Sequence, residues 1–341
     1  MRRGSPDGAF ISTAVGKRAP HRPMWIMRQA GRYLPEYRAV REKLSFLELC
    51  RSPEAAAEVT LQPIDRYGMD AAILFTDLLI PVEAMGIGLK YNPGPVLDST
   101  IAAHNDVEAL SVLNPQADLA PMLDTVSLVR KRLDENKALI GFVGAPFTLA
   151  CYMIEGRGSK NWDRTRRMMH ADAALFSALL DKIVTCIEPL VGALVESGCD
   201  AVQTFDSWAS VLTPSDYAEL CGPNTERLLQ AAKDAGGLAI NYVNGAAQHM
   251  PTMSTSCADI LAFDWRIDMK DARQIAPDDK VLQGNMDPTA LYSPADSLCE
   301  KVRDVCTAAG RDRHVFNLGH GILPDVSPEA LNVVLNEVRR S

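Results

Sequence analysis

The sequence predicts an α/β protein, a single distorted (β/α)8 barrel with its active cleft at the carboxyl ends of the strands. Eight short apolar segments are typical of buried strands, a helical pattern follows each of them, and 341 residues suit one barrel of about 250 residues plus insertions. The expected strands are residues 24–27, 71–75, 139–143, 201–204, 238–242, 260–263, 281–283 and 315–318.

The helix starts are marked by a hydroxyl residue at the N-cap and proline at the first helical position. Four places have this pair: Ser52-Pro53, Thr213-Pro214, Ser293-Pro294 and Ser327-Pro328. Strands that alternate with helices favour parallel pairing through crossover connections. A doubly wound open sheet is the alternative, but no GxGxxG turn follows the first strand.

We expect residues 1–20 to form an N-terminal arm or short helix and residues 21–341 to form the barrel domain. The hydrophobic fraction of 47% excludes a disordered chain, and the net charge of −8 excludes a generally basic nucleic-acid-binding protein. The eight cysteines have neither CxxC nor zinc-ligand spacing, which predicts reduced thiols in a cytoplasmic protein. The longest charge-free apolar stretch, residues 138–154, is interrupted by glycine and proline, so we expect neither a membrane span nor a signal peptide.

A barrel of this kind carries its chemistry on the loops that follow the strands. Polar and glycine residues do gather in those loops, although any surface loop is polar to some degree. In chain order they include Arg28, Gln29, Arg32, Asp77, Tyr152, Asp206, Ser207, Asn244, Asp264, Asn285, Asp287, Gly319, His320 and Gly321.

The loop after the first expected strand contains three arginines within residues 28–38, and Arg41 follows. A guanidinium binds a carboxylate through two parallel hydrogen bonds, so this cluster in an acidic protein predicts a clamp for a polyanion. The alternative is a solvated loop with internal ion pairs, for which Glu36 and Glu42 are available. The sequence leaves both interpretations open.

Asp77 is flanked by apolar residues, and a buried carboxylate needs hydrogen-bond donors. It either accepts main-chain N–H groups at a turn or helix start, or faces a cavity and binds donors of a ligand. His320 lies between two glycines and is either a general acid, a polar anchor or a structural histidine. Tyr152 and Ser207 are weaker candidates, and no G-x-S-x-G elbow surrounds the serine.

Taken together, these segments resemble the uroporphyrinogen decarboxylase family. The matching strings are MWIMRQAGRYLPEYR at residues 24–38, LFTDLLIPVEAMG at 74–86, GFVGAPFTLACYMIEG at 141–156, AVQTFDSWAS at 201–210, GNMDPTAL at 284–291 and FNLGHGILP at 316–324. They run in the order of the family from near residue 20 to the C-terminus. Thr76 stands where serine is expected and Met286 where leucine is common.

The resemblance implies a cytosolic homodimer that converts the four acetate side chains of uroporphyrinogen III to methyl groups, giving coproporphyrinogen III and four CO2. It implies neither a metal nor an organic cofactor. By motif match, Asp77 and Arg28 are the catalytic residues. Arg28 and Arg32 bind substrate carboxylates, and Asp77 accepts the pyrrole N–H groups and stabilises positive charge. The remaining substrate-binding residues are Gln29, Ala30 and Gly31 in the same loop, and Tyr152, Ser207 and His320 beside the acetate or propionate groups.

Two other functions compete with this interpretation. A zinc- and corrinoid-dependent methyltransferase would need thiolate and histidine ligands at metal spacing, and no H-x-C occurs at any of the six histidines. A non-catalytic tetrapyrrole carrier would need the same binding residues as an enzyme. Retention of both Asp77 and the whole arginine loop favours the enzyme.

Overall fold

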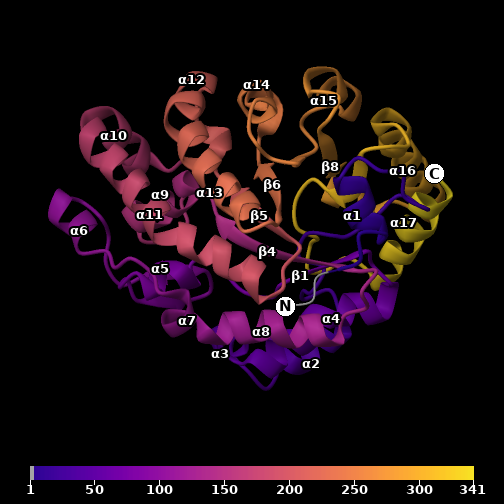
Figure 1. The fold of residues 1–341 in the computed structure, drawn as a ribbon, viewed down its shortest axis with the longest axis horizontal. Coiled ribbons are helices and arrows are strands. Elements are labelled where there is room, and N and C mark those ends of the chain that lie inside the picture. Colours follow the sequence, from indigo (N-terminus) through magenta and orange to yellow (C-terminus); the bar gives the residue numbers. More distant parts are fainter. Residues whose placement is uncertain (1–3) are drawn as a thin grey trace.

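The computed structural model describes residues 4–341, and residues 1–3 of the predicted arm lie outside the described residues. Seven parallel strands form one curled sheet in the order β1-β4-β5-β6-β7-β8-β9, and Figure 1 shows the longer helices arranged around its outside. A separate antiparallel hairpin pairs β2 with β3. Within the described part of the chain, no helix has the length and apolar character needed to span a membrane.

The strands are β1 (Ala71–Ile73), β2 (Leu89–Tyr91), β3 (Pro95–Leu97), β4 (Ala138–Gly144), β5 (Ala201–Asp206), β6 (Leu238–Val243), β7 (Ile260–Phe263), β8 (Val281–Met286) and β9 (His314–Leu318). The helices are α1 (Ala9–Ala14), α2 (Pro35–Arg41), α3 (Phe46–Arg51), α4 (Pro53–Tyr67), α5 (Ile80–Ala84), α6 (His104–Glu108), α7 (Pro115–Asp118), α8 (Ala120–Arg132), α9 (Pro146–Glu155), α10 (Asp163–Ala171), α11 (Ala173–Ser197), α12 (Pro214–Asp216), α13 (Gly222–Asp234), α14 (Met250–Ser254), α15 (Met269–Ile275), α16 (Ala295–Ala309) and α17 (Pro328–Arg340). A π-helical turn, Tyr217–Cys221, precedes α13, and short 3-10 turns cover Ala209–Val211, Ala246–Gln248 and Pro288–Tyr292.

Seven of the eight expected strands are confirmed, but residues 24–27 do not form one. Met24 makes a single parallel bridge to Phe316 of β9, and on its other side its carbonyl accepts the Asp70 N–H at 2.9 Å. Farther along, the Met27 N–H donates to the side chain of Asn317 at 3.0 Å instead of to a neighbouring strand. Side-chain amides thus take the place of the ladder. The expected count of eight strands is therefore wrong for the sheet, which has seven.

Three of the four marked helices begin at the expected proline, namely α4, α12 and α17. The Thr213 and Ser327 side chains accept main-chain N–H groups of the turns that they cap. The last helix differs by one position, because α16 begins at Ala295 with Pro294 rather than Ser293 as its N-cap. Helix ends commonly vary by a residue or two.

The inside of the curled sheet is filled by alternate residues of the strands, since successive side chains of a strand point to opposite faces. This inner cluster is rich in small residues such as Ala71, Ala138 and Ala201 at the amino ends of the strands. Phe10 of α1 packs into the same cluster and is fully buried. These side chains fill the inner face at the amino-terminal end of the sheet. All eight cysteines are free, and six of them are buried.

Candidate active site

Arg28 stands at the bend where the chain leaves the inner core. Its backbone adopts a left-handed conformation with φ of 61°, and its side chain is exposed. The aliphatic part of the side chain lies against Gly321, where a Cβ would overlap the Arg28 Cδ and Cγ atoms. Glycine at 321 is therefore what allows the arginine to lie across the loop after β9.

Gln29 is fully buried, and its amide is used by the main chain. Its Oε1 accepts the Ile26 N–H at 3.0 Å, and its Nε2 donates to the Ala71 carbonyl at 3.1 Å. The side chain thus joins the arginine loop to β1. Ala30 and Gly31 are partly exposed on the same loop. Gln29 fixes the main chain of this loop through these two hydrogen bonds. Its contact with substrate stays a prediction.

The alternative that the arginine loop is only an ion-paired surface fits some of its members. Arg38 donates to the carbonyls of Arg32 and Tyr33, and Arg41 donates to the carbonyl of Leu44. Glu36, expected as an internal partner, instead pairs with Arg66 at 2.6 Å.

The structure therefore separates the two kinds of arginine. Arg38 and Arg41 stabilise the loop through hydrogen bonds to its carbonyls, whereas Arg28 packs against the loop after β9. Arg32 is exposed, and across residues 4–341 none of its described contacts ties it to Asp77 or His320.

Asp77 follows β1 and satisfies both interpretations made from the sequence. Its Oδ1 accepts the Leu79 N–H at 2.9 Å at the start of α5, and Tyr91 of the hairpin donates a hydrogen bond to the same carboxylate. The side chain is only partly covered. Burial raises the pKa of Asp77, and these two hydrogen bonds and the charge of Arg28 act in the opposite direction. Asp77 is thus a carboxylate beside a guanidinium at the end of a strand.

Tyr152 of α9 is a third side chain near Asp77 and Arg28. Its pKa is raised to about 12 by burial and by the negative charge of Asp77, while Arg28 acts to lower it. Its ring packs edge-on against Trp162 and Trp208, with centroid separations of 5.2 and 6.2 Å. The aromatic rings hold the phenol in place next to the aspartate and the arginine.

His320 lies on the loop after β9, where its Nδ1 accepts the Gly321 N–H at 2.7 Å. The proton of the neutral ring is therefore on Nε2. Burial, helped by the charge of Arg28, lowers the pKa of His320 to about 4. At neutral pH the ring is an uncharged donor, which favours the polar anchor over the general acid among the roles considered for it.

Ser207 is fixed through its main chain. Its N–H donates to the Thr148 Oγ1 at 2.9 Å, and its carbonyl accepts from the Asn244 side chain at 3.0 Å. The same Thr148 hydroxyl donates to Asp206 at 2.8 Å. This chain of hydrogen bonds ties the loop after β5 to α9 and to the loop after β6.

The structure brings Arg28, Asp77, Tyr152 and His320 into one electrostatic neighbourhood at the carboxyl end of the sheet. Sequence reasoning missed two tyrosines of this region. Tyr91 lies on a hairpin for which the turn residues Asn92-Pro93-Gly94 were an available signal. Tyr242 lies on the inner face of β6 and donates to the Gly319 carbonyl at 2.8 Å, which braces the histidine loop.

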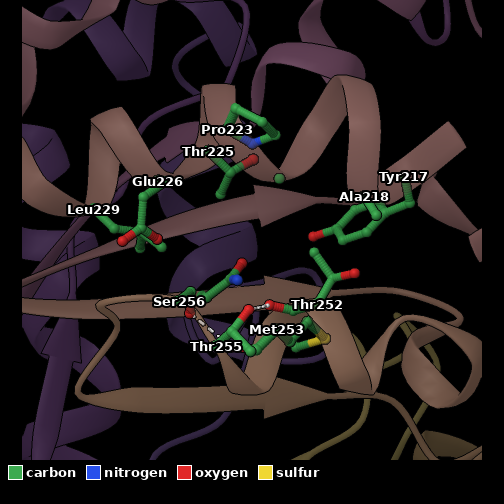
Figure 2. Close-up of a pocket in the computed structure, with 12 residues that line it drawn as sticks. Tyr217, Ala218, Pro223, Thr225, Glu226, Leu229, Thr252, Met253, Thr255 and Ser256 are labelled. Atoms are coloured by element: carbon green, nitrogen blue, oxygen red, sulfur yellow. Dashed lines mark hydrogen bonds between the residues drawn. The ribbon is translucent and has the colours of Figure 1, made fainter. Parts of the chain in front are cut away.

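Within residues 4–341 no group of three or more His, Cys, Asp or Glu side chains is arranged to hold a metal ion. A pocket does open on the outside of the sheet between α13 and α14, with Tyr217, Thr225, Glu226, Thr252 and Ser256 among its lining residues (Figure 2). None of the predicted site residues lines it.

The comparisons with known proteins agree on the family. The family model of uroporphyrinogen decarboxylase (URO-D) matches residues 5–341. The uroporphyrinogen decarboxylase of Geobacter metallireducens is 46% identical over 324 residues, covering 95% of each chain. That of Trichlorobacter lovleyi is 44% identical over 335 residues, covering 98% of each chain.

Among solved structures, a methyltransferase from Methanosarcina mazei has a TM-score of 0.82 at 17% identity and covers 99% of both chains. A B12-independent methionine synthase from Shewanella sp. has a TM-score of 0.58 at 12% identity over 87% of this chain and 91% of that one. At such identities these two structures show a shared fold alone. The sequence relatives and the family model decide the membership: this chain belongs to the uroporphyrinogen decarboxylase family.

Proposed function

We propose that this chain removes CO2 from the four acetate side chains of uroporphyrinogen III in successive steps, giving coproporphyrinogen III without a metal or organic cofactor. The observation that carries the proposal is the grouping of Arg28, Asp77 and His320 at one end of the sheet in a chain that belongs to this family. Each step exchanges one carboxylate for one proton.

The charge of the substrate fits the arginine loop. The porphyrinogen carries eight carboxylates, and the guanidinium groups of Arg28 and Arg32 supply planar forks for carboxylates in a chain of net charge −8. Both arginines are exposed. In this proposal Arg28 binds next to the reacting group, and Arg32 binds a carboxylate farther out on the loop, with Gln29, Ala30 and Gly31 shaping the surface between them.

The reaction needs a sink for the electrons of the bond that breaks. Protonation of the pyrrole carbon next to the acetate-bearing carbon creates a cation, and loss of CO2 returns the bonding electrons to that ring. A proton then adds to the exocyclic carbon and completes the methyl group, while the ring proton is released. An ionised Asp77 stabilises the cationic ring by about 4 kcal/mol for a pair at about 4 Å and an effective dielectric constant of about 20.

Tyr152, Ser207 and His320 bind the acetate and propionate groups in this scheme. The neutral His320 offers its Nε2 proton as a hydrogen-bond donor. Arginine side chains stay protonated in proteins, so Arg28 holds a carboxylate and is not assigned as the proton donor.

The finer features of the assembly belong to the same proposal. Residues 24–27 take the place of an eighth strand and complete a distorted barrel, supported by the Met24–Phe316 bridge and the hydrogen bond from Asp70 to Met24. The resemblance to the family supports a homodimer that acts in the cytoplasm, with residues 1–20 as an arm ahead of the barrel domain. The acidic net charge supports a function without nucleic acid.

The decisive experiment is incubation of the purified chain with uroporphyrinogen III, with separation of the porphyrin products after oxidation. We expect the intermediates with seven, six and five carboxylates and then coproporphyrin III. Tight binding without loss of CO2 would identify a carrier instead. Metal analysis of the same preparation tests the methyltransferase alternative, which requires bound zinc.

A further inference from the structure

The loop Gly319-His320-Gly321 packs between two segments that each carry an arginine. A Cβ on Gly319 would lie 2.6 Å from the Trp265 main-chain nitrogen, and a Cβ on Gly321 would overlap the Arg28 side chain. The segment after β7 therefore touches one end of this loop and Arg28 touches the other. Arg266, the residue after Trp265, therefore belongs to a segment that touches this loop, and its charge acts on His320 as that of Arg28 does.

Arg266 is held by residues from two strand ends. Its Nη1 donates to the Asn244 Oδ1 at 2.8 Å and pairs with the Oδ2 of Asp264, which is fully buried. The other oxygen of Asp264 accepts two main-chain N–H groups from the loop after β6, at 3.0 and 3.1 Å. The Arg266 Cζ also lies 4.6 Å from the centroid of the Trp265 ring. This guanidinium is therefore held in a fixed position.

The remainder of the guanidinium is available. The side chain of Arg266 is 50% exposed, and both protein acceptors use the same nitrogen, Nη1. In the hydrogen bonds described for residues 4–341, Nε and Nη2 have no acceptor. A guanidinium carries five N–H donors, and the Nε–Nη2 edge is one that can bind a carboxylate through two hydrogen bonds. Arg266 lies near the candidate active site, since its charge acts to lower the pKa of both His320 and Tyr242, as that of Arg28 does.

We propose that Arg266 binds a carboxylate of the substrate near His320, separate from the carboxylate that Arg28 binds. The inference rests on the proposed function. A cyclic octacarboxylate presents acidic groups on both sides of the pyrrole ring that faces the catalytic residues. Arg28 and Arg266 then hold two carboxylates of one substrate, both near His320. The competing explanation is that Arg266 serves only as the counter-ion of the buried Asp264.

The test compares Arg266→Gln with Arg227→Gln. Arg227 on α13 is a matched control, since it is 41% exposed and pairs with Glu188 at 3.0 Å on the outer surface. We expect R266Q to raise KM for uroporphyrinogen by about tenfold to about a hundredfold, with kcat within about threefold of wild type. R227Q should leave both constants unchanged. The dependence of KM on salt should also weaken in R266Q, because one ion pair with the substrate is lost.

A second variant, Arg266→Lys, separates binding from a purely structural role. Lysine keeps a cation beside Asp264 but loses the planar fork, so we expect wild-type thermal stability with a raised KM. An R266Q enzyme with wild-type KM would overturn the inference. The same conclusion would follow if R266Q differed from wild type only in thermal stability and R266K matched wild type in both KM and stability. A wild-type chain that does not decarboxylate uroporphyrinogen at all would instead refute the proposed function, so the two failures are distinguishable.

Discussion

Asp77 and Asp206 are two carboxylates that lie at or just beyond the carboxyl ends of strands, and burial raises the pKa of both. Their surroundings differ. Asp77 is partly exposed, accepts hydrogen bonds from Leu79 and Tyr91, and has Arg28 nearby. Asp206 is fully buried, its pKa is raised to about 7, and no cation appears among the groups that act on it.

The difference lies in which face of the sheet each side chain takes. Side chains alternate along β5, so Phe205 joins the inner cluster and Asp206 points outward. There the charge of Asp206 acts on Cys151 and Cys221, which belong to the core between the sheet and the helices. Burial alone therefore does not distinguish the two carboxylates. Asp77 differs by its access to solvent and by the nearby charge of Arg28, which support the catalytic role that we propose for it.

The largest expected effect is on turnover after Asp77→Asn. The amide keeps the shape and removes the charge, so the cationic ring loses about 4 kcal/mol of stabilisation and kcat should fall about a thousandfold. The measurement is the initial rate of uroporphyrinogen decarboxylation. Asp206→Asn serves as the comparison and should retain turnover within about tenfold. Near wild-type turnover in D77N would remove the distinction between the two carboxylates.

Asp206→Asn should instead change how stability depends on pH. The pKa of Asp206 in the folded protein, about 7, exceeds its ordinary value of 3.8, so the folded state holds the proton more tightly than the unfolded state. Its contribution to stability is fully present below about pH 4 and is lost as pH rises through about 7, a total of about 4 kcal/mol.

Urea unfolding of wild type and D206N at about pH 5.5 and about pH 8 measures this loss. The wild type should lose about 2 kcal/mol more than the variant over that interval. An equal loss in both proteins would show that Asp206 is already ionised in the fold. The buried Oδ2 of Asp206 has no hydrogen-bond partner among the described residues, which is why a neutral side chain suits the site.

Arg28→Lys and Arg32→Lys test whether the arginines of the loop after residue 27 bind substrate carboxylates. A cation of this kind lies near Asp77, and none is among the groups that act on Asp206. Lysine retains charge but not the planar two-donor geometry, so we expect kcat/KM to fall about tenfold in R28K. The loss should be smaller in R32K, because Arg28 and not Arg32 is among the charges that act on Asp77. Arg38→Lys is the control, because the Arg38 guanidinium bonds only loop carbonyls among its described contacts. Steady-state kinetics give the answer. Unchanged constants in both R28K and R32K would remove the carboxylate clamp.

Most strands of the sheet could be predicted from the local sequence pattern. Short apolar segments bounded by turns are typical of buried strands, and the segments that form β1 and β4 to β9 are buried in the structure. The segment 24–27 has that pattern too. It does not form a strand because two side chains accept its main-chain N–H groups. Gln29, on the following turn, accepts the Ile26 N–H, and Asn317, distant in sequence, accepts the Met27 N–H. Such side-chain substitution for a ladder is set by tertiary contacts, and periodicity does not report it.

The same limit applies to the site. Arg28, Asp77 and His320 follow strands directly, so the barrel rule places them at one end. The contact of Tyr91 with Asp77 depends on a hairpin that folds back from 14 residues farther along the chain. The outward direction of Asp206 depends on where β5 ends, and the expected strand ended two residues too early, at 204.

The smallest expected effect comes from Tyr91→Phe, which tests directly whether hydrogen-bond donors distinguish Asp77 from Asp206. The hydrogen bond of Tyr91 acts to lower the pKa of Asp77, so its removal should raise that pKa and move the acid limb of the kcat/KM profile upward by about one pH unit. The ring still packs against Phe46, with centroids 4.7 Å apart, so the fold should be kept. Tyr292→Phe is the matched control, because Tyr292 donates to Asp325 at an exposed place. An unshifted acid limb in Y91F would mean that Asp77, like Asp206, is governed by burial rather than by its donors.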